Sequence, residues 1–296
     1  RGVPHWLALT GRYWADESRL QRDLSRICGA HAALFGELPH DRYLFLAQVT
    51  ADGYGGLEHC YSSSLLCARD DLPALGKDNT TPGYRRFLGL CSHEYFHLWH
   101  VKRIRPLAFL GSGLRQEVHT RLLWVFEGIT SYYDELALVR CGCIDEKEYL
   151  ALLAEAISRV LRNPGRRVQT LAESSFDAWT KFYRQDENSP NVIVSYYAKG
   201  ALVALALDLL IRGETAGALS LDNVMRSLWD RYGRTGIGLG ERGFEALAEE
   251  VTGLDLGPFF HRALDTTEEL DLVRLLAAIR IGMPLGVDLH ARGPVP

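Results

Sequence analysis

The sequence predicts an α+β protein in which a small sheet-bearing part precedes a mainly helical part. Before residue 81, segments rich in aromatic and β-branched residues, such as residues 43–49, alternate with Gly-rich turns, as short strands do. After Pro82, apolar residues recur at the three- and four-residue spacing of amphipathic helices. With 47% hydrophobic and 24% charged residues over 296 positions, the composition is that of a globular protein, not a disordered or fibrous one.

The expected elements follow from this patterning. The sheet-bearing part should hold a strand at residues 5–13, a helix at 18–35, and strands at 43–49 and 57–67. The first long helix should begin at Pro82, with Thr81 as its N-cap, and continue to about residue 102 before Pro106 ends it. Further helices are expected at about residues 116–140, 145–162, 195–212, 221–232, 241–252 and 268–280. A long polar and aromatic loop at residues 163–194 is expected to line a cleft.

We therefore expect three parts along the chain. Residues 1–81 form the sheet-bearing part, residues 82–280 the helical part, and the Gly- and Pro-rich residues 281–296 a linker toward a further domain.

Charge and hydropathy exclude several classes of partner. With 33 Lys and Arg against 37 Asp and Glu, the net charge of -4 gives no electrostatic reason to expect nucleic acid. No stretch reaches the roughly 18 apolar residues that a membrane span needs. Six cysteines in a chain of this length do not demand a disulfide framework, which favours a cytoplasmic location, or a periplasmic or secreted one if a leader has been removed. Nothing in the sequence indicates an oligomeric state.

A His-Glu-x-x-His motif, formed by His93, Glu94 and His97, lies within the first long helix. Residues four apart lie on one face of a helix, about 6 Å apart at Cβ, so both imidazoles can bind one zinc ion. Glu94 would then lie beside the open coordination position, where its carboxylate can accept a proton from the attacking water. The alternative is a helix whose histidines merely pack or cap.

Three residues could complete the ligand set, because a catalytic zinc takes three protein ligands and a water. His100 follows His97 by three residues, but on a straight helix it would crowd the ion. Glu117 and Glu127 lie twenty and thirty residues past His97, and Glu127 has the more apolar, helix-forming neighbourhood. Spacing alone does not decide among them. Asp134, seven residues past Glu127, could accept a hydrogen bond from a ligand histidine.

At this point the residues resemble a known family. Trp124-x-x-Glu127-Gly128-x-Thr130 is similar to the third-ligand helix of the gluzincin aminopeptidases, and residues 93–106 resemble the glycyl aminopeptidase family more closely still. The resemblance implies a thermolysin-like catalytic domain with one Zn²⁺ ion held by His93, His97 and Glu127. It also implies a β-rich domain before this part and a PDZ domain after it. One departure is His100, where we expect Asn.

The Gly55-Gly56-Leu57-Glu58-His59 run precedes an apolar strand. From its chemistry alone, a carboxylate beside two glycines could bind an ammonium group, or could be an exposed turn. The run resembles the Gly-x-Met-Glu-Asn exopeptidase motif of related aminopeptidases, with Leu57 for Met and His59 for Asn. The resemblance implies that Glu58 anchors the α-amine of the substrate and that Gly55 and Gly56 contact its backbone.

The Tyr196-Tyr197-Ala-Lys-Gly200 run opens a long apolar helix. A tyrosine pair at such a place most often packs in the core. The run nevertheless resembles the gluzincin segment that supplies the transition-state tyrosine, which implies that Tyr197 donates to the oxyanion of the tetrahedral intermediate.

Together these residues predict a zinc-dependent aminopeptidase acting on peptides with a free N-terminus, and the resemblance implies a preference for N-terminal Gly and Ala. Two alternatives use the same residues differently. One is a zinc endopeptidase in which Glu58 has no role, and the other is a binding or scaffold protein whose site has lost activity.

Overall fold

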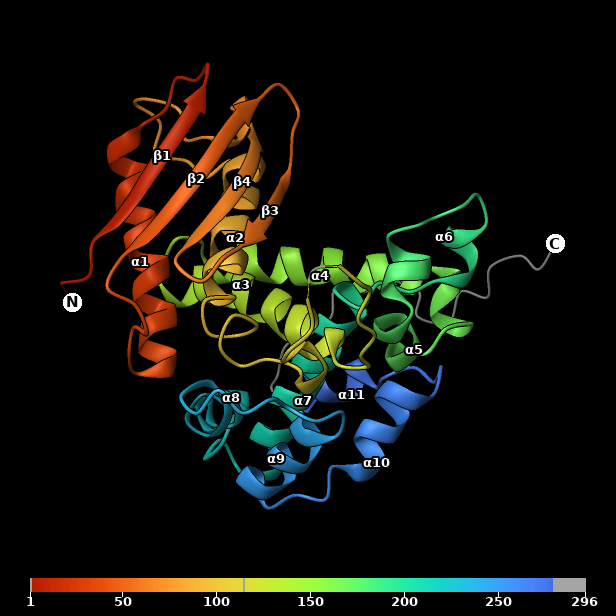
Figure 1. Cartoon of the computed structure of the whole chain (residues 1–296). Coiled ribbons are helices and arrows are strands. Elements are labelled where there is room, and N and C mark those ends of the chain that lie inside the picture. Colours follow the sequence, from red (N-terminus) through yellow and green to blue (C-terminus); the bar gives the residue numbers. More distant parts are fainter. Residues whose placement is uncertain (1, 114, 279–296) are drawn as a thin grey trace. The chain divides into compact units, whose positions relative to one another are not determined.

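The computed structural model describes residues 2–113 and 115–278, so the linker expected at residues 281–296 lies outside the described residues. The chain divides into two compact units. The first comprises Arg1–Ser112, Thr130–Leu150 and Met225–Glu241, and the second comprises Gly113–Ile129, Ala151–Val224 and Arg242–Pro296. The α+β class predicted from the sequence is confirmed, with a small N-terminal sheet followed by helices (Figure 1).

The first unit contains a four-stranded sheet with the order β1-β2-β4-β3. Strands β1 (His5–Gly11), β2 (Tyr43–Thr50) and β4 (Ser62–Ala68) run parallel to one another, and β3 (Gly55–Glu58) pairs antiparallel with β4. Because β3 pairs with β4 alone among the described strands, it is an edge strand of this sheet. The Gly-Gly-Leu-Glu run therefore lies where an extended peptide could add a further strand.

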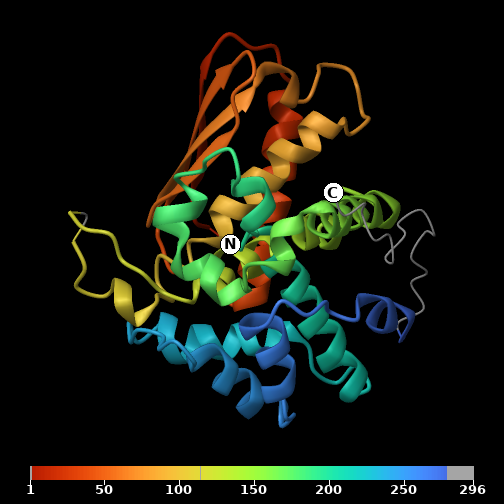
Figure 2. The same ribbon diagram turned by 90° about the vertical axis from the view of Figure 1, so that its right-hand side faces the viewer.

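Helices cover one face of the sheet (Figure 2). Helix α1 (Glu17–Phe35) begins at Asp16, whose side chain accepts from the Arg19 amide, and ends at Gly36 in the left-handed conformation. The buried β2 residues Tyr43 and Phe45 pack against Tyr95 of helix α2 (Pro82–Phe96). This packing fixes α2, which carries the His-Glu-x-x-His motif, against the sheet.

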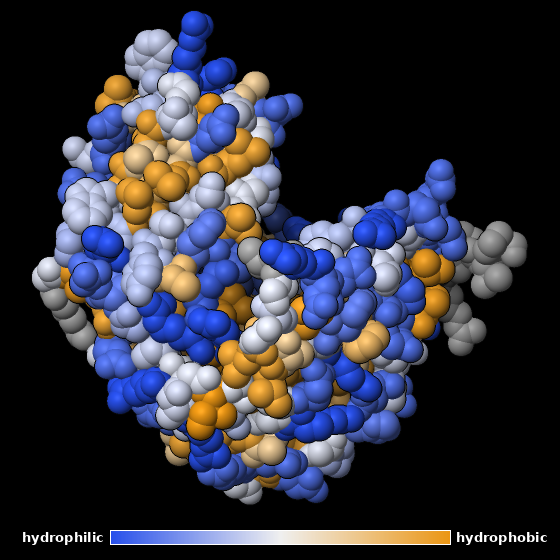
Figure 3. Space-filling view, in the orientation of Figure 1, coloured by the Kyte–Doolittle hydropathy of each residue, from blue (hydrophilic) through white to orange (hydrophobic). Residues whose placement is uncertain are grey.

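The opposite face of the sheet is uncovered within this unit. Apolar side chains gather over it in Figure 3, and the exposed residues include Trp6, Leu46 and Leu57. The alternation along β2 explains this, since successive side chains point to opposite faces of a sheet.

The predicted start of α2 is confirmed, but its predicted end is wrong. Thr81 caps the helix and Pro82 is in its first turn, as expected. The helix ends at Phe96, not near residue 102. Beyond it the amides of Leu98 and Trp99 bond three residues back, and Val101 has a positive φ of 128° that reverses the chain. No Gly or Pro marks this turn, so periodicity could not predict it.

The first unit also holds most of α3 (Ile129–Arg140), the start of α4 (Glu146–Arg162), the end of α8 (Leu221–Leu228) and the π-helical turn η6 (Trp229–Gly233). The single helix expected at residues 116–140 is wrong in its first part. Regular structure begins only with the π-helical turn η3 (Trp124–Gly128), which leads directly into α3. Glu117 is therefore not on a helix.

The second unit is helical. Its core is α7 (Ala198–Glu214), with α9 (Gly243–Thr252), α10 (Gly257–Phe260) and α11 (Leu272–Ala278) following along the chain. The loop expected at residues 163–194 contains short helices: α5 (Leu171–Phe176), α6 (Ser189–Val192), a 3₁₀ turn (Pro164–Arg167) and the π-helical turn η5 (Ala178–Phe182). Among the described residues, no helix is both long and apolar enough to cross a membrane.

Candidate metal centre and active-site residues

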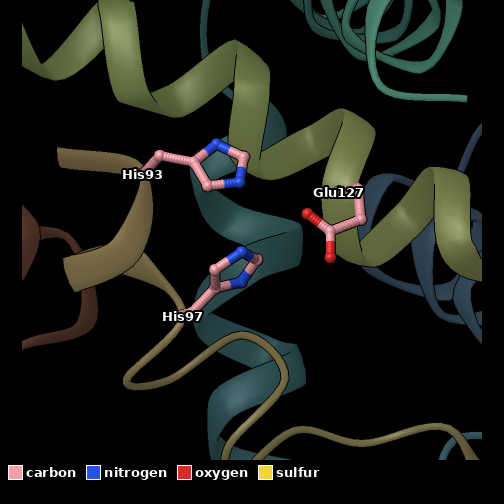
Figure 4. Close-up of side chains that lie close together, drawn as sticks. All are labelled: His93, His97 and Glu127. Atoms are coloured by element: carbon pink, nitrogen blue, oxygen red, sulfur yellow. The ribbon is translucent and has the colours of Figure 1, made fainter. Parts of the chain in front are cut away.

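Three of the predicted ligands lie close together. His93 is on α2, His97 directly follows the end of that helix, and Glu127 is on the π-helical turn η3. Figure 4 shows the two imidazoles and the carboxylate near one another, and their potential ligand atoms lie within 4.8 Å of one another. Two histidines and one carboxylate are a donor set that suits zinc with an open position for water.

The His93 ring is oriented by Asp134 of α3. Its Nδ1 lies 2.9 Å from Asp134 Oδ2. Burial raises the pKa of Asp134, and the contact with His93 opposes that rise. The hydrogen bond assigns the proton of the neutral imidazole to Nδ1, which leaves Nε2 as the nitrogen for a metal. The contact expected between Asp134 and a ligand histidine is therefore present.

The His97 ring is oriented by the backbone. Its Nδ1 donates to the carbonyl oxygen of His100 at 2.8 Å, so Nε2 is again the nitrogen for a metal. The contact lies where the chain tightens beyond the end of α2, with the amides of Leu98 and Trp99 bonded three residues back. Both histidines thus carry the supporting hydrogen bond that ligand histidines usually have, and the residues present fit a zinc ion.

The two other candidate ligands lie elsewhere. His100 is fully buried, and its Nδ1 lies 3.2 Å from Thr130 Oγ1. Glu117 pairs at the surface with Arg184, at 3.4 Å. Among the described residues, neither belongs to a group that could hold a metal ion. His100 acts instead through its backbone, a role that its side chain could not indicate.

Glu94 is buried beside β3. A β-carbon placed on Gly56 would overlap Glu94 Oε1, so any larger residue at this position would displace the carboxylate. The potential ligand atoms of Glu58, Glu94 and His97 also lie within 4.8 Å of one another. The first unit thus brings the predicted base and the predicted amine anchor to one place, beside the edge strand.

Glu58 has a cationic partner. Lys102 Nζ lies 3.0 Å from Glu58 Oε1, and both side chains are about a quarter exposed. The sequence did not predict this ion pair. The only available signal was the position of Lys102 within the run that resembles the glycyl aminopeptidases.

Tyr197 lies at the start of α7, in the second unit. Burial and the nearby Glu127 carboxylate raise its pKa far above the ordinary value, so the phenol keeps its proton and can donate it. Tyr196 is fully buried and stacks on Tyr197 with 4.7 Å between ring centroids. The predicted proton donor is therefore the less buried of the two.

Two glycines bring Glu127 and Tyr197 near each other. A β-carbon on Gly128 of η3 would lie 2.6 Å from Gly200 Cα of α7, so the two elements touch backbone to backbone. Such an approach requires glycine at both positions. This explains why a Gly follows Glu127 directly and why Gly200 follows the tyrosine pair.

Comparison with known proteins adds to this geometry. Residues 86–203 match the sequence model of the M61 glycyl aminopeptidases. An aminopeptidase N family protein from Idiomarina loihiensis is 47% identical, with a TM-score of 0.90, over 92% of this chain and 46% of that one. The chain belongs to the glycyl aminopeptidase family. It spans about half the length of that solved relative.

More distant structures share the fold. An M1 zinc metallopeptidase from Deinococcus radiodurans is 14% identical with a TM-score of 0.58, over 90% of this chain and 49% of that one. Native LTA4 hydrolase from yeast is 17% identical with a TM-score of 0.57, over 86% and 36% of the two chains. No curated protein matches this chain. The match over residues 86–203 and the 47% identical relative confirm the family resemblance inferred from the motifs.

Proposed function

We propose that the chain is the catalytic part of a zinc-dependent aminopeptidase that removes small N-terminal residues, Gly and Ala, from peptides. The observation that carries the proposal is the proximity of His93, His97 and Glu127, with the supporting hydrogen bonds of both histidines. Membership of the glycyl aminopeptidase family supports it. The preference for Gly and Ala rests on the family alone.

The ligands and the base have separate tasks. When bound by His93, His97 and Glu127, a zinc ion supplies Lewis acidity to the water and to the scissile carbonyl. Glu94 accepts a proton from the attacking water and passes it to the leaving amine. Its burial beside Gly56 holds the carboxylate in one place, which favours both transfers.

The oxyanion that forms needs a donor. Tyr197 keeps its phenolic proton, because burial and the Glu127 carboxylate raise its pKa far above the ordinary value. It can therefore donate a hydrogen bond that strengthens as negative charge develops. Removing one such donor typically costs about 10²–10³ in rate.

The proposal places the selectivity for the N-terminal residue at strand β3. An extended peptide adding to this edge strand would have its register set by backbone hydrogen bonds, and Glu58 would pair with its ammonium. Because Glu58 lies close to Glu94 and His97, the anchored terminus would place the first peptide bond at the base.

The test uses a glycyl peptide with a free or an acetylated N-terminus, each with and without a zinc chelator. We expect cleavage of the free peptide only, and its loss with the chelator. Cleavage of both peptides would instead support the endopeptidase, with Glu58 idle. If a zinc-loaded preparation cleaves neither peptide, the result would contradict the proposed enzymatic activity and favour a binding protein.

The variant Glu58→Gln sharpens this test. It keeps the shape of the side chain and removes the charge that binds the ammonium. We expect it to raise KM for the free peptide at least tenfold. Glu146→Gln, an exposed carboxylate on α4, is the matched control and should leave KM unchanged.

A further inference from the structure

A third tyrosine joins the pair at the start of α7. Tyr183, which follows the π-helical turn η5, places its hydroxyl 3.2 Å from that of Tyr197. The hydroxyl of Tyr196 donates to the same Tyr183 oxygen at 3.1 Å. All three residues belong to the second unit.

Either hydroxyl can donate in the contact between Tyr183 and Tyr197, so the acceptor that Tyr197 itself meets decides the direction. A phenol has one proton to donate and an oxygen that can accept. The bond from Tyr196 uses only the Tyr183 oxygen, so the Tyr183 proton is available for Tyr197. When Tyr197 gives its own proton to an oxyanion, it can only accept from Tyr183. In that state the chain of donation runs from Tyr196 through Tyr183 to Tyr197.

The ring contacts hold this arrangement. Phe182, the last residue of η5, contacts both tyrosines at the start of α7. Its ring centroid lies 4.9 Å from that of Tyr196 and 5.8 Å from that of Tyr197. The Tyr183 amide closes η5 by bonding to the Ala178 carbonyl. Trp179 of the same turn donates its indole N–H to the Val118 carbonyl. The hydroxyl of Tyr183 is thus positioned from its own backbone turn, although 60% of the residue is exposed.

We propose that Tyr183 is a positioning residue for Tyr197: its hydroxyl donates to the Tyr197 oxygen and so directs the Tyr197 proton toward the oxyanion of the substrate. Hydrogen bonds in a chain polarise one another, so the same contact makes Tyr197 a better donor. The inference rests on the proposed function because it needs an oxyanion as the final acceptor. It assigns a role to a residue of the segment that the sequence predicts to be a loop.

The test is a double-mutant cycle with Tyr183→Phe, Tyr197→Phe and the double variant. Tyr183→Phe removes one hydroxyl from an exposed ring, so thermal stability and zinc content should match the wild type. We expect kcat on a glycyl peptide to fall about tenfold while KM changes less than twofold, because the lost contact acts in the transition state. In the Tyr197→Phe background, the second substitution should cost nothing more.

A binding measurement provides a readout that does not depend on turnover. A phosphinic dipeptide analogue with a free amine places an anionic oxygen where the oxyanion forms. The Ki of this analogue should rise by a similar factor in Tyr183→Phe. In the Tyr197→Phe background, adding Tyr183→Phe should raise Ki no further. Tyr13→Phe, a tyrosine of the first unit whose hydroxyl lies 3.5 Å from Glu17, is the matched control and should change neither quantity.

The outcomes separate the two proposals. If the wild type cleaves the peptide and Tyr183→Phe has the same kcat and Ki, the positioning role is overturned. The proposed function would remain intact. Losses that multiply in the double variant would also overturn it, because Tyr183 would then act independently of Tyr197. A zinc-loaded wild type that neither cleaves nor binds the analogue would overturn the proposed function, and the inference with it.

Discussion

Lys102 forms an ion pair with Glu58, the carboxylate predicted to bind the substrate amine, with 3.0 Å between Nζ and Oε1. The protein thus carries an ammonium of its own beside the carboxylate that, under the proposed function, would bind the substrate ammonium. Lys102 follows the strained turn at Val101, so its backbone is fixed while its long side chain can withdraw. A peptide that enters has to compete with this side chain.

Replacing Lys102 with Met tests this competition. The variant keeps the length and apolar stem of the side chain and removes its charge. We expect KM for glycyl peptides to fall about two- to fivefold with little change in kcat, since a partly exposed ion pair contributes up to about 1 kcal/mol. Steady-state kinetics at low and at high salt measure it, and the difference between variant and wild type should shrink at high salt. A rise in KM would show that Lys102 helps to hold the substrate.

Replacing Gly56 with Ala tests the contact between β3 and the base. The new β-carbon would overlap Glu94 Oε1, so the carboxylate has to move. Displacing a catalytic group by about 1 Å can cost about 10²-fold. We expect a loss of that size in kcat, with zinc content unchanged.

Gly89→Ala, within α2, is the control for this substitution. A β-carbon there meets nothing within 4 Å. It should keep full activity and raise the free energy of unfolding by about 0.5–1 kcal/mol, because Ala favours a helix more than Gly does. Equal kinetics for the two glycine variants would contradict the role of Gly56.

Replacing Asp134 with Asn tests the orientation of His93. The amide is a weaker acceptor than the carboxylate and can present its N–H₂ group to Nδ1, so the ring is held less well. We expect zinc affinity to fall about 10- to 100-fold, measured by competition with a chromogenic chelator. Activity should return to near the wild-type value at saturating zinc. A variant that binds zinc as tightly as the wild type would remove Asp134 from the site.

Stability should fall in acid because of His31. This residue is buried, with Nε2 2.8 Å from Ser92 Oγ, and burial together with Arg140 lowers its pKa to about 3. The unfolded chain takes up a proton near pH 6.5, whereas the folded chain does not until about pH 3. The free energy of unfolding therefore decreases as pH falls through this window, with a slope from this group of up to about 1.4 kcal/mol per pH unit.

Urea unfolding at pH 7, 6, 5 and 4 measures this slope. His31→Gln should be less stable than the wild type at pH 7 and should lose stability less steeply below pH 6. His261→Gln, whose side chain is 72% exposed, serves as the control. A slope that is the same in His31→Gln and in the wild type would mean that other groups account for the acid sensitivity, such as His40, whose pKa burial also lowers, to about 4.

The sequence predicted the parts that depend on local periodicity and caps. The α+β class and the start of α2 at Thr81 and Pro82 follow from such signals. The end of α2 was missed because the reversal at Val101 uses a β-branched residue with positive φ, which tertiary contacts impose and no turn residue marks. The π-helical turn η3 was missed for a similar reason, since Glu127 lies in an apolar run that also fits an ordinary helix.

Within the site, the sequence predicted the functional side chains but not the contacts that hold them in place. His93, His97 and Glu127 could be named from motif spacing and resemblance. The His100 carbonyl, the Lys102 ion pair and the room that Gly56 leaves for Glu94 depend on three-dimensional packing. Asp134 was the exception, because its helical spacing from Glu127 already suggested an outer contact to a ligand histidine.

The contact between Gly128 and Gly200 has a mechanical consequence. With no side chains between them, η3 and α7 have no compressible layer at this crossing, and thermal motion of one backbone is transmitted to the other. A displacement of the η3 backbone at Gly128 would therefore displace α7 at Gly200. The predicted metal ligand and the predicted proton donor would fluctuate together as a single body, and their separation would stay fixed even if the surrounding loops move.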